Sequence, residues 1–363
     1  MKKKVLLLGV LFILFISVGC AQKEEGVEVE RTETEKEFQI GMSFDSFVIE
    51  RWQKDRDVFV STAKELGAEV NVQNANGDLE EQIAQIEYFI DKKMDVIVII
   101  CIDSDGLGEV VQKAKNAGIK VIAYDRLIKN AGVDLYISFD NEMVGTMMGE
   151  GVVSRGDEVE NVLMLGGPLT DNNVSLVERG FERMMREQGI YIIDKMHADG
   201  WKAELGAEYV YDHVDMVERA DVIMCGNDDI ATAVFRALSE KRLAGKIGIV
   251  GQDADLAACQ RIVQGTQIMT VYKPVEKLAQ KAAECAIALG KGEEVEAETT
   301  IDDGSFQVPY VALTPVSVYR ENMDDVIINS GFHLKEDVYL NIPAGRDTEK
   351  DDKTSDSGNG HGN

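Results

Sequence analysis

At five points in the chain, a short apolar run ends in polar residues. The runs cover residues 121–124, 162–165, 222–224, 247–250 and 268–271, and the polar residues after them are Asp125, Arg126, Asp171, Asn173, Asn227, Asp253 and Lys273. Carboxylates accept hydrogen bonds, guanidinium and ammonium groups donate them, and amides do both. Any one of these residues could instead cap a helix or satisfy a loop. Five sets in register favour a site for a small, neutral ligand rich in hydroxyl groups.

The apolar runs also predict the elements that position these side chains. Short apolar runs bounded by turns are typical of strands buried on both faces of a parallel sheet. Amphipathic segments lie between them. Residues 50–66 place Trp52 and Phe59 on one helical face, and Asp78 with Glu81 resembles a capping box. In sheets built from such alternation, ligands bind outside the carboxyl ends of the strands, where the polar residues lie.

The pattern of strand and helix runs through the chain twice. It occupies roughly 300 residues, which is enough for two domains. The cycle restarts after Asn141, at the apolar run that begins with Val162. Crossovers between parallel strands are right-handed, so each half should fold as a doubly wound sheet. The predicted fold class is therefore α/β, with two similar doubly wound parallel-sheet lobes.

The ends of the chain have a different character. Residues 1–19 combine three lysines, an apolar stretch and small residues before Cys20, which predicts a lipoprotein signal peptide. The residues before Cys20 resemble a bacterial lipobox, with Ser17 at a position that is usually Leu. The resemblance implies lipidation of Cys20 and anchoring at the outer face of the cytoplasmic membrane. Residues 20–37 are predicted to be a disordered tether and residues 342–363 a disordered acidic tail.

Charge and cysteine usage exclude some classes of partner. The formal net charge is −27, and a strongly acidic surface repels phosphate backbones, so nucleic acid is not an expected partner. Apart from Cys20 the cysteines are Cys101, Cys225, Cys259 and Cys285. None is paired at a spacing typical of metal sites. We expect them to be buried free thiols, although disulfides are possible in an exported protein.

Motifs for catalysis are missing from the sequence. It has no G-x-x-x-x-G-K-[ST] phosphate loop, no G-x-S-x-G elbow and no H-E-x-x-H helix, and its four histidines are scattered. Residues 103–106 hint at a calcium loop but lack the later acidic positions of an EF-hand. We therefore predict a solvated turn there, no required metal, no cofactor and no enzymatic activity.

Longer motifs then resemble a known family. They are E-R-W-Q-K-D-R-D at residues 50–57, A-Y-D-R at 123–126, Y-I-S-F-D-N at 136–141, G-Q-D-A-D-L at 251–256 and M-T-V-Y-K-P at 269–274. In this order they resemble the D-xylose-binding proteins of bacterial ABC importers, within the type I periplasmic binding protein family. The resemblance covers roughly residues 40–333. It implies two lobes joined by three crossing segments, with a sugar in the cleft between them.

The resemblance also implies lobe boundaries and site residues. The crossings would lie near residues 140–141, 272–274 and 313–315. The N-terminal lobe would comprise residues 38–141 plus 275–312, and the C-terminal lobe residues 142–274 plus 313–341. The implied sugar contacts are Arg51, Asp125, Arg126, Asp171, Asn173, Trp201, Asn227, Asp253 and Lys273, with Phe47 as a possible cover for one face of the sugar.

Some of these residues have an alternative interpretation. Arg51 could be a surface residue of its helix, and Trp201 could belong to the core. Lys273 could pair with an exposed carboxylate for little energy. In the sugar-binding interpretation, Trp201 offers an apolar face to the C–H groups of the ring.

Two positions depart from the family pattern. Glu178 stands where the family carries Arg, one turn into the helix after Asp171. Arg179 points about 100° away around that helix, so it cannot simply substitute unless the helix register shifts. His197 stands where relatives have Trp, and we expect it to be exposed.

The expected function is that of a lipid-anchored monomer that delivers an aldopentose, D-xylose in the first place, to an ABC permease. A second hypothesis gives the same lobes a sensing role, in which they dock on a membrane histidine kinase or chemoreceptor. A third keeps the transport role with a different monosaccharide. A sugar-responsive repressor of related fold is disfavoured, because this chain begins with an export signal and is acidic.

Overall fold

The computed structural model describes residues 38–49, 51–156 and 158–342, and within them two β-sheets form the frame. The predicted signal peptide, the lipidation site at Cys20, the tether, and all but the first residue of the predicted tail lie outside the described residues. Within the described residues, no helix is both long and apolar enough to cross a bilayer.

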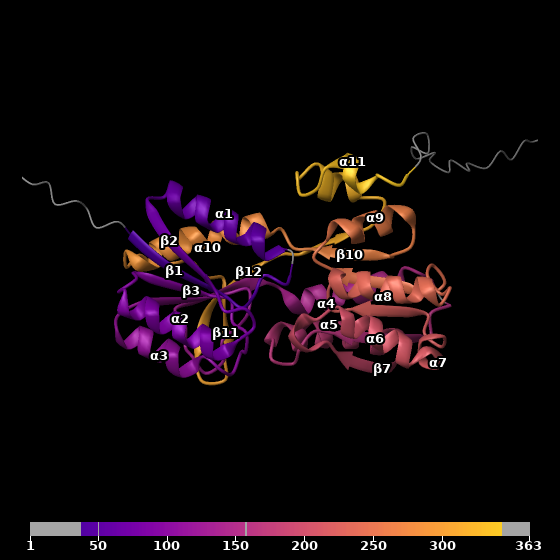
Figure 1. Cartoon of the computed structure of the whole chain (residues 1–363), viewed down its shortest axis with the longest axis horizontal. Coiled ribbons are helices and arrows are strands. Elements are labelled where there is room, and N and C mark those ends of the chain that lie inside the picture. The colour runs from indigo at the N-terminus through magenta and orange to yellow at the C-terminus, as the bar shows by residue number, and fades with distance from the viewer. Residues whose placement is uncertain (1–37, 50, 157, 343–363) are drawn as a thin grey trace, which may run out of the picture. The chain divides into compact units, whose positions relative to one another are not determined.

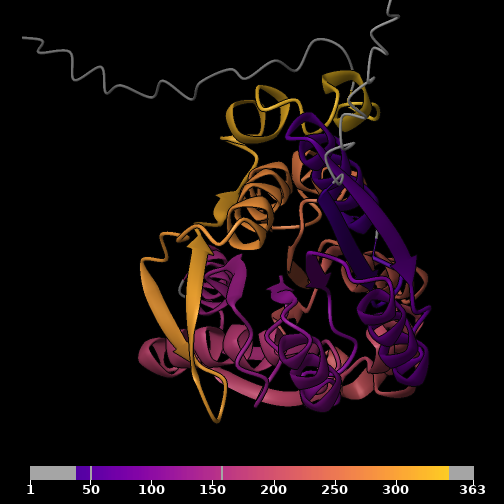
Figure 2. The same cartoon turned by 90° about the vertical axis from the view of Figure 1, so that its left-hand side faces the viewer.

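The first sheet has seven strands in the order β11-β12-β5-β4-β3-β1-β2. The strands are β1 (Phe38–Phe44), β2 (Ala68–Asn74), β3 (Val96–Ile99), β4 (Lys120–Tyr124), β5 (Leu135–Phe139), β11 (Thr299–Asp302) and β12 (Gln307–Leu313). All pairings are parallel except that of β11 with β12. Figure 2 shows the β11–β12 hairpin, in orange, at one edge of this sheet, and β1 and β2, in indigo, towards the other.

Helices cover both faces of the first sheet (Figure 1). One face packs against α1 (Arg51–Glu65) and α10 (Val275–Gly290), and the other against α2 (Leu79–Asp91) and α3 (Gly108–Asn116). Alternate strand residues enter the two cores, with Val98 on the α1 side and Ile97 on the α2 side. The expected cap at Asp78 is present, because its carboxylate accepts hydrogen bonds from the backbone N–H groups of Glu80 and Glu81.

The second sheet has six strands in the order β13-β10-β9-β8-β6-β7. They are β6 (Asn161–Gly166), β7 (Tyr191–His197), β8 (Val222–Cys225), β9 (Gly248–Gln252), β10 (Met269–Tyr272) and β13 (Val316–Val318), and β13 alone is antiparallel to its neighbour in this sheet. One face packs against α4 (Asn141–Val153) and α5 (Asn172–Gln188), and the other against α6 (Glu204–Asp212) and α8 (Asp228–Glu240).

Short elements complete this half of the molecule. They are η1 (Asp199–Trp201), α7 (Val214–Val217), α9 (Leu256–Gln264), a π-helical turn η2 (Asp324–Ile328) and α11 (Lys335–Val338). The segment with η2 and α11, yellow in Figure 1, packs beside α9. Its core contacts join Met323 and Ile327 to Tyr272 of β10.

The chain passes between the two sheets three times. It leaves the first sheet between β5 and α4, returns between β10 and α10, and leaves again between β12 and β13. The predicted fold of two doubly wound lobes with three connections is therefore confirmed. The sheets are mixed instead of purely parallel, because β11 and β13 join their edges in the antiparallel sense.

Close packing of α4 against α5 fixes the position of a helix that faces the site. A Cβ at Gly145 of α4 would overlap the carbonyl oxygen of Val177 in α5, and a Cβ at Gly180 of α5 would overlap that of Glu142 in α4. The two helix backbones therefore touch. The side chains of α5 are therefore held in fixed positions.

We expect Gly145→Ala to destabilise the protein by about 1–3 kcal/mol, because the added methyl group meets backbone atoms that cannot rotate away. Urea unfolding would measure the change in free energy. Gly108→Ala is the matched control, because its Cβ would lie 3.6 Å from the nearest atom, an ordinary contact distance. Its effect should stay within about 0.5 kcal/mol. Equal effects of the two substitutions would contradict backbone contact between α4 and α5.

Candidate functional site

A pocket that is partly open to solvent collects residues from the carboxyl ends of strands in both sheets. Nine of the ten predicted contact residues line it, namely Arg51, Asp125, Arg126, Asp171, Asn173, Trp201, Asn227, Asp253 and Lys273. Phe47 is not among the lining residues. Its ring packs against Phe44 with centroids 4.9 Å apart, and the Arg56 guanidinium lies 5.3 Å from its centre.

Arg51 opens α1 and is held by carboxylates on two sides. Its Nε donates to Asp55, one helical turn later, at 3.2 Å, and its Nη2 donates to Asp125 at 3.0 Å. Asp55 also accepts a hydrogen bond from the hydroxyl of Tyr124, the last residue of β4. The guanidinium lies 4.5 Å from the centre of the Trp52 ring. Arg51 is thus a buried, oriented donor and not a surface helix residue.

Arg126 connects the two halves of the site. Its Nη1 donates to Asp45 at 2.7 Å and to the carbonyl oxygen of Cys101 at 3.0 Å. Its Nε lies 2.8 Å from Asp171, which belongs to the second lobe. Asp171 caps α5, since its other carboxylate oxygen accepts from the backbone N–H of Asn173 at 2.9 Å. The ion pair therefore ties the end of β4 to the start of α5.

Asp125 and Asp253 occupy equivalent places in the two lobes. Asp125 follows β4 with φ of 64°, and Asp253 follows β9 with φ of 95°. Non-glycine residues rarely adopt this region, and such strained positions cluster at functional sites. Neighbours hold the turn at Asp125, because its carbonyl oxygen accepts hydrogen bonds from Ser138 at 2.6 Å and from Asn173 at 2.9 Å. The unusual backbone turns both carboxylates into the pocket.

Charges in the pocket largely pair with one another. Lys273, on the connection after β10, lies 2.8 Å from Asp253, and an Arg51 nitrogen lies 3.9 Å from the same carboxylate. At Asp125 burial favours the neutral acid, but the charges of Arg51, Lys273 and Arg126 outweigh burial and hold the pKa below its usual value. Asp125 is therefore ionised and accepts hydrogen bonds only. No cation in the described cluster lacks a carboxylate neighbour, which disfavours an anionic ligand.

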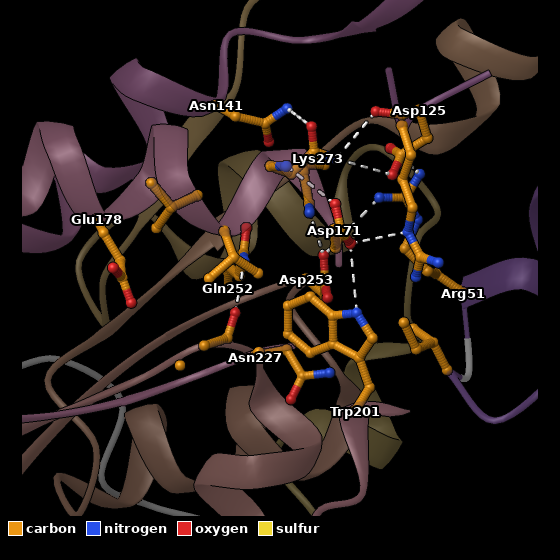
Figure 3. A pocket seen from close by; sticks show the side chains of 18 of the residues that line it. Arg51, Asp125, Asn141, Asp171, Glu178, Trp201, Asn227, Gln252, Asp253 and Lys273 are labelled. Atoms are coloured by element: carbon orange, nitrogen blue, oxygen red, sulfur yellow. Dashed lines mark hydrogen bonds and ion pairs between the residues drawn. The ribbon is translucent and has the colours of Figure 1, made fainter. Parts of the chain in front are cut away.

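Trp201 lines the pocket, and Figure 3 shows its ring directed toward Asp171. Its indole N–H donates to Asp171 at 3.3 Å, and its backbone φ is 58°. A Cβ at Gly167 would overlap the ring, so a glycine is needed where β6 ends. This arrangement presents an aromatic face to the pocket in a fixed orientation.

Among the lining residues that the sequence did not mark as contacts, two carry an unpaired polar atom. Trp52 Nε1 and Gln252 Oε1 are buried and have no hydrogen-bond partner among residues 38–49, 51–156 and 158–342. Buried polar atoms are normally paired, so a ligand or water in the pocket is their natural partner. The sequence had placed Trp52 only on one face of its helix, together with Phe59. Both residues stand within the family-like motifs, which is the signal that could have found them.

Glu178 also lines the pocket, and it pairs with His197. Oε1 of Glu178 lies 2.8 Å from Nε2 of His197. The expectation of an exposed His197 was wrong, since 28% of its side chain is accessible and the ring packs on Glu178. The register of α5 is not shifted, because Arg179 points outward, with 60% of its side chain exposed, and lies 3.5 Å from Glu142.

Other residues singled out in the sequence do not line the pocket. Cys101, Cys225, Cys259 and Cys285 are buried free cysteines, as predicted. Asp103 accepts a hydrogen bond from the backbone N–H of Asp105 at 2.8 Å, which forms a local turn. In the part of the chain that the structure describes, no group of three or more His, Cys, Asp and Glu residues is placed to hold a metal ion.

Residues 40–294 match the family model of the periplasmic binding protein domain. The chain belongs to the periplasmic binding protein family. Members of this family are extracytoplasmic solute-binding proteins of transport systems. Among similar curated proteins are the D-xylose-binding periplasmic proteins of Haemophilus influenzae and Escherichia coli. They are 44% and 43% identical to this chain, and each match covers 84% of this chain and 93% of the relative.

Solved structures agree on the fold. An ABC transporter solute-binding protein from Clostridium phytofermentans with bound β-D-glucose has a TM-score of 0.75 at 28% identity, over 83% of this chain and 99% of that one. A carbohydrate transporter solute-binding protein from Chloroflexus aurantiacus with D-glucose has a TM-score of 0.76 at 25% identity, over 82% and 98%. The two-lobed α/β architecture is therefore that of the type I periplasmic binding proteins.

A buried carboxyl supports the loop that carries Asp253. Asp228 is fully buried, and its Oδ2 accepts hydrogen bonds from the Thr270 hydroxyl at 2.6 Å and the Asp255 backbone N–H at 3.3 Å. Thr270 Oγ1 in turn accepts from the backbone N–H of Ala254 at 3.2 Å. Burial raises the pKa of Asp228 to about 7. The loop with positive φ at Asp253 and Ala254 thus rests on a titratable group.

We expect Asp228→Asn to flatten the dependence of stability on pH. In the unfolded chain an Asp titrates near ~3.9, whereas the folded pKa is about 7. The stability contributed by the neutral carboxyl is full below about pH 4 and is lost as the pH rises through about 7. Urea unfolding from about pH 4 to 8 should show this loss in the wild type and much less of it in the variant. Parallel profiles for the two proteins would contradict the raised pKa.

Proposed function

We propose that this protein is a sugar receptor of an ABC importer, with D-xylose as its ligand. The observation that carries the proposal is the convergence of oriented donors and acceptors from both lobes on one pocket with an aromatic wall. The relatives that match over most of their length are D-xylose-binding periplasmic proteins, which supports this choice of ligand. A neutral aldopentose suits a pocket whose charges already pair with one another.

The proposed binding mechanism uses each lobe for part of the ligand. Arg51 and Asp125, from the first lobe, would hold neighbouring hydroxyls as donor and acceptor. Asn227 and Asp253, from the second, would complete the ring of hydrogen bonds, with Trp201 against the C–H face. Closure of the lobes about their three connections would exclude water from these bonds. A sugar with one wrong hydroxyl leaves a buried group unpaired, which costs about 1–3 kcal/mol. Binding without chemical turnover completes the proposed role.

The lipid anchor and the lobe boundaries are part of the same proposal. Cys20, which lies outside the described residues, would carry the lipid that holds the receptor at the membrane beside its permease. Cys20→Ser should then release the protein into the soluble fraction.

The lobes would comprise residues 38–141 with 275–312, and residues 142–274 with 313–341. The strand order of the two sheets is consistent with this division.

Asn227 allows a sharp test of the binding site. Its Oδ1 caps α8 by accepting from the backbone N–H of Ile230 at 2.9 Å, and its amide nitrogen is left to face the pocket. Asn227→Asp keeps the capping oxygen and removes the donor. We expect the affinity for D-xylose, measured by isothermal titration calorimetry, to fall about 10- to 100-fold, the range for a lost bond of 1.5–3 kcal/mol. The cap on α8 is kept, because Asp caps helices as well as Asn. The unfolding temperature without sugar should therefore fall only by the cost of placing a carboxylate at this buried position.

Asn71→Asp on β2, outside the pocket, controls for the added charge and should leave affinity unchanged. Wild-type affinity in Asn227→Asp would contradict the assignment of this pocket. Binding of another monosaccharide, but not D-xylose, would keep the receptor role and correct the ligand.

A further inference from the structure

The wall of the pocket on α5 differs from the rest. Val174 and Val177 present apolar side chains there, and each is 4% exposed. Glu178 follows them and brings a carboxylate into this wall. Figure 3 shows Glu178 at the opposite side of the pocket from Arg51 and Asp125. It is therefore separate from the ion-pair network that holds the other carboxylates.

Glu178 has few partners for a carboxylate of low exposure. Its side chain is 14% exposed. Within the described residues, His197 Nε2 at 2.8 Å is the hydrogen-bond partner of this carboxylate, and no other side chain or backbone group bonds to it. A carboxylate has about four acceptor positions, and poorly solvated ones are normally filled. The pocket side of Glu178 therefore has acceptor capacity for a ligand.

The backbone is built around this pair. Gly166 and His197 end β6 and β7 and are partners in the sheet register. A Cβ at Gly166 would lie 3.1 Å from Glu178 Oε1 and 3.5 Å from the His197 ring, so the glycine leaves room for both side chains. His197 thus reaches Glu178 from the end of a strand, which fixes the carboxylate more firmly than a loop would.

The two partners are also the two departures from the family pattern. The resemblance implied Arg and Trp at these two positions, whereas Glu178 and His197 stand here and touch each other. A change at one position alone would leave a carboxylate without its partner. With both residues present, this wall of the pocket carries a positioned carboxylate, which accepts hydrogen bonds.

We propose that Glu178 determines ligand specificity by accepting a hydrogen bond from a sugar hydroxyl, and that His197 positions it. The inference rests on the proposed sugar-binding function. It requires the ligand to place an O–H donor at the α5 wall. Analogues that lack this hydroxyl, or that carry an acceptor-only group such as fluorine in its place, should bind weakly, because the Glu178 carboxylate would then be desolvated without compensation.

Calorimetry with D-xylose and its monodeoxy and monofluoro analogues tests this on the wild type and Glu178→Gln. We expect Glu178→Gln to weaken D-xylose binding about 10- to 100-fold, as for a lost hydrogen bond to a charged group. One analogue should bind the wild type equally weakly, and Glu178→Gln should then discriminate little between that analogue and D-xylose. Such a pairing identifies the hydroxyl that Glu178 contacts.

Matched variants separate a contact from a structural role. Arg179→Gln, next in sequence but 60% exposed and pointing outward, should bind like the wild type. His197→Gln keeps an amide near the position of Nε2 and should retain most affinity, whereas His197→Ala should lose as much as Glu178→Gln. The unfolding temperatures of all the sugar-free variants should lie close together. A drop in affinity that tracks a drop in unfolding temperature would overturn the specificity role.

Failure of the inference is distinguishable from failure of the proposed function. If the wild type binds D-xylose and Glu178→Gln binds it equally well, the role of Glu178 is wrong and the receptor function stands. If the wild type binds another monosaccharide, the same comparison with the deoxy forms of that sugar decides the role of Glu178. If it binds no monosaccharide, both proposals are contradicted.

Discussion

Buried charges at the carboxyl ends of the two sheets constrain everything else in this molecule. Arg51 and Arg126 are almost inaccessible, and a buried cation is tolerated only when it is paired. Their partners are Asp55 and Asp125 for the first, and Asp45 and Asp171 for the second. Because Asp171 comes from the other lobe, the pairing ties the site together across the lobes. Such a network stabilises little by itself but fixes the direction of each donor and acceptor.

The fold fixes the direction of these groups by using the same strained turn after a strand in both lobes. Asp125 and Asp253 follow equivalent strands and both have left-handed backbone conformation. Hydrogen bonds hold the two turns: the Ser138 hydroxyl donates to the carbonyl oxygen of Asp125, and the backbone N–H of Ala254 donates to the Thr270 hydroxyl oxygen. The α4–α5 contact through glycines then sets where Asn173 and Glu178 stand. The polar groups of such a site are held rigidly, and their charges largely pair with one another. The site can therefore select among neutral polyols by the geometry of their hydroxyl groups, but it attracts charged ligands poorly.

Sequence patterns predicted seven polar residues that follow strands, and all seven line one pocket, because strand ends in a parallel sheet must meet at one edge. Arg51 and Trp201, which also line it, were implied by the family resemblance alone. The features that these patterns did not predict depend on contacts between residues distant in sequence. His197 was expected to be exposed, but it contacts Glu178, which lies 19 residues away and could not be identified as its partner from a local pattern. Asp228 was not singled out in the sequence, because the side chains that hydrogen-bond to this buried carboxyl, Thr270 and Gln267, lie 42 and 39 residues away. The antiparallel strands β11 and β13 lie in segments without clear periodicity, so only tertiary packing defines them.

The most direct test of the proposed binding site uses the two tryptophans of the protein. The sequence contains two, Trp52 and Trp201, and both line the pocket. Titration of the protein with D-xylose should therefore change the tryptophan emission saturably, with a midpoint equal to the dissociation constant from calorimetry on the same sample. Calorimetric binding without any change in emission would place the sugar elsewhere and contradict the site, and the absence of both signals would contradict D-xylose as the ligand.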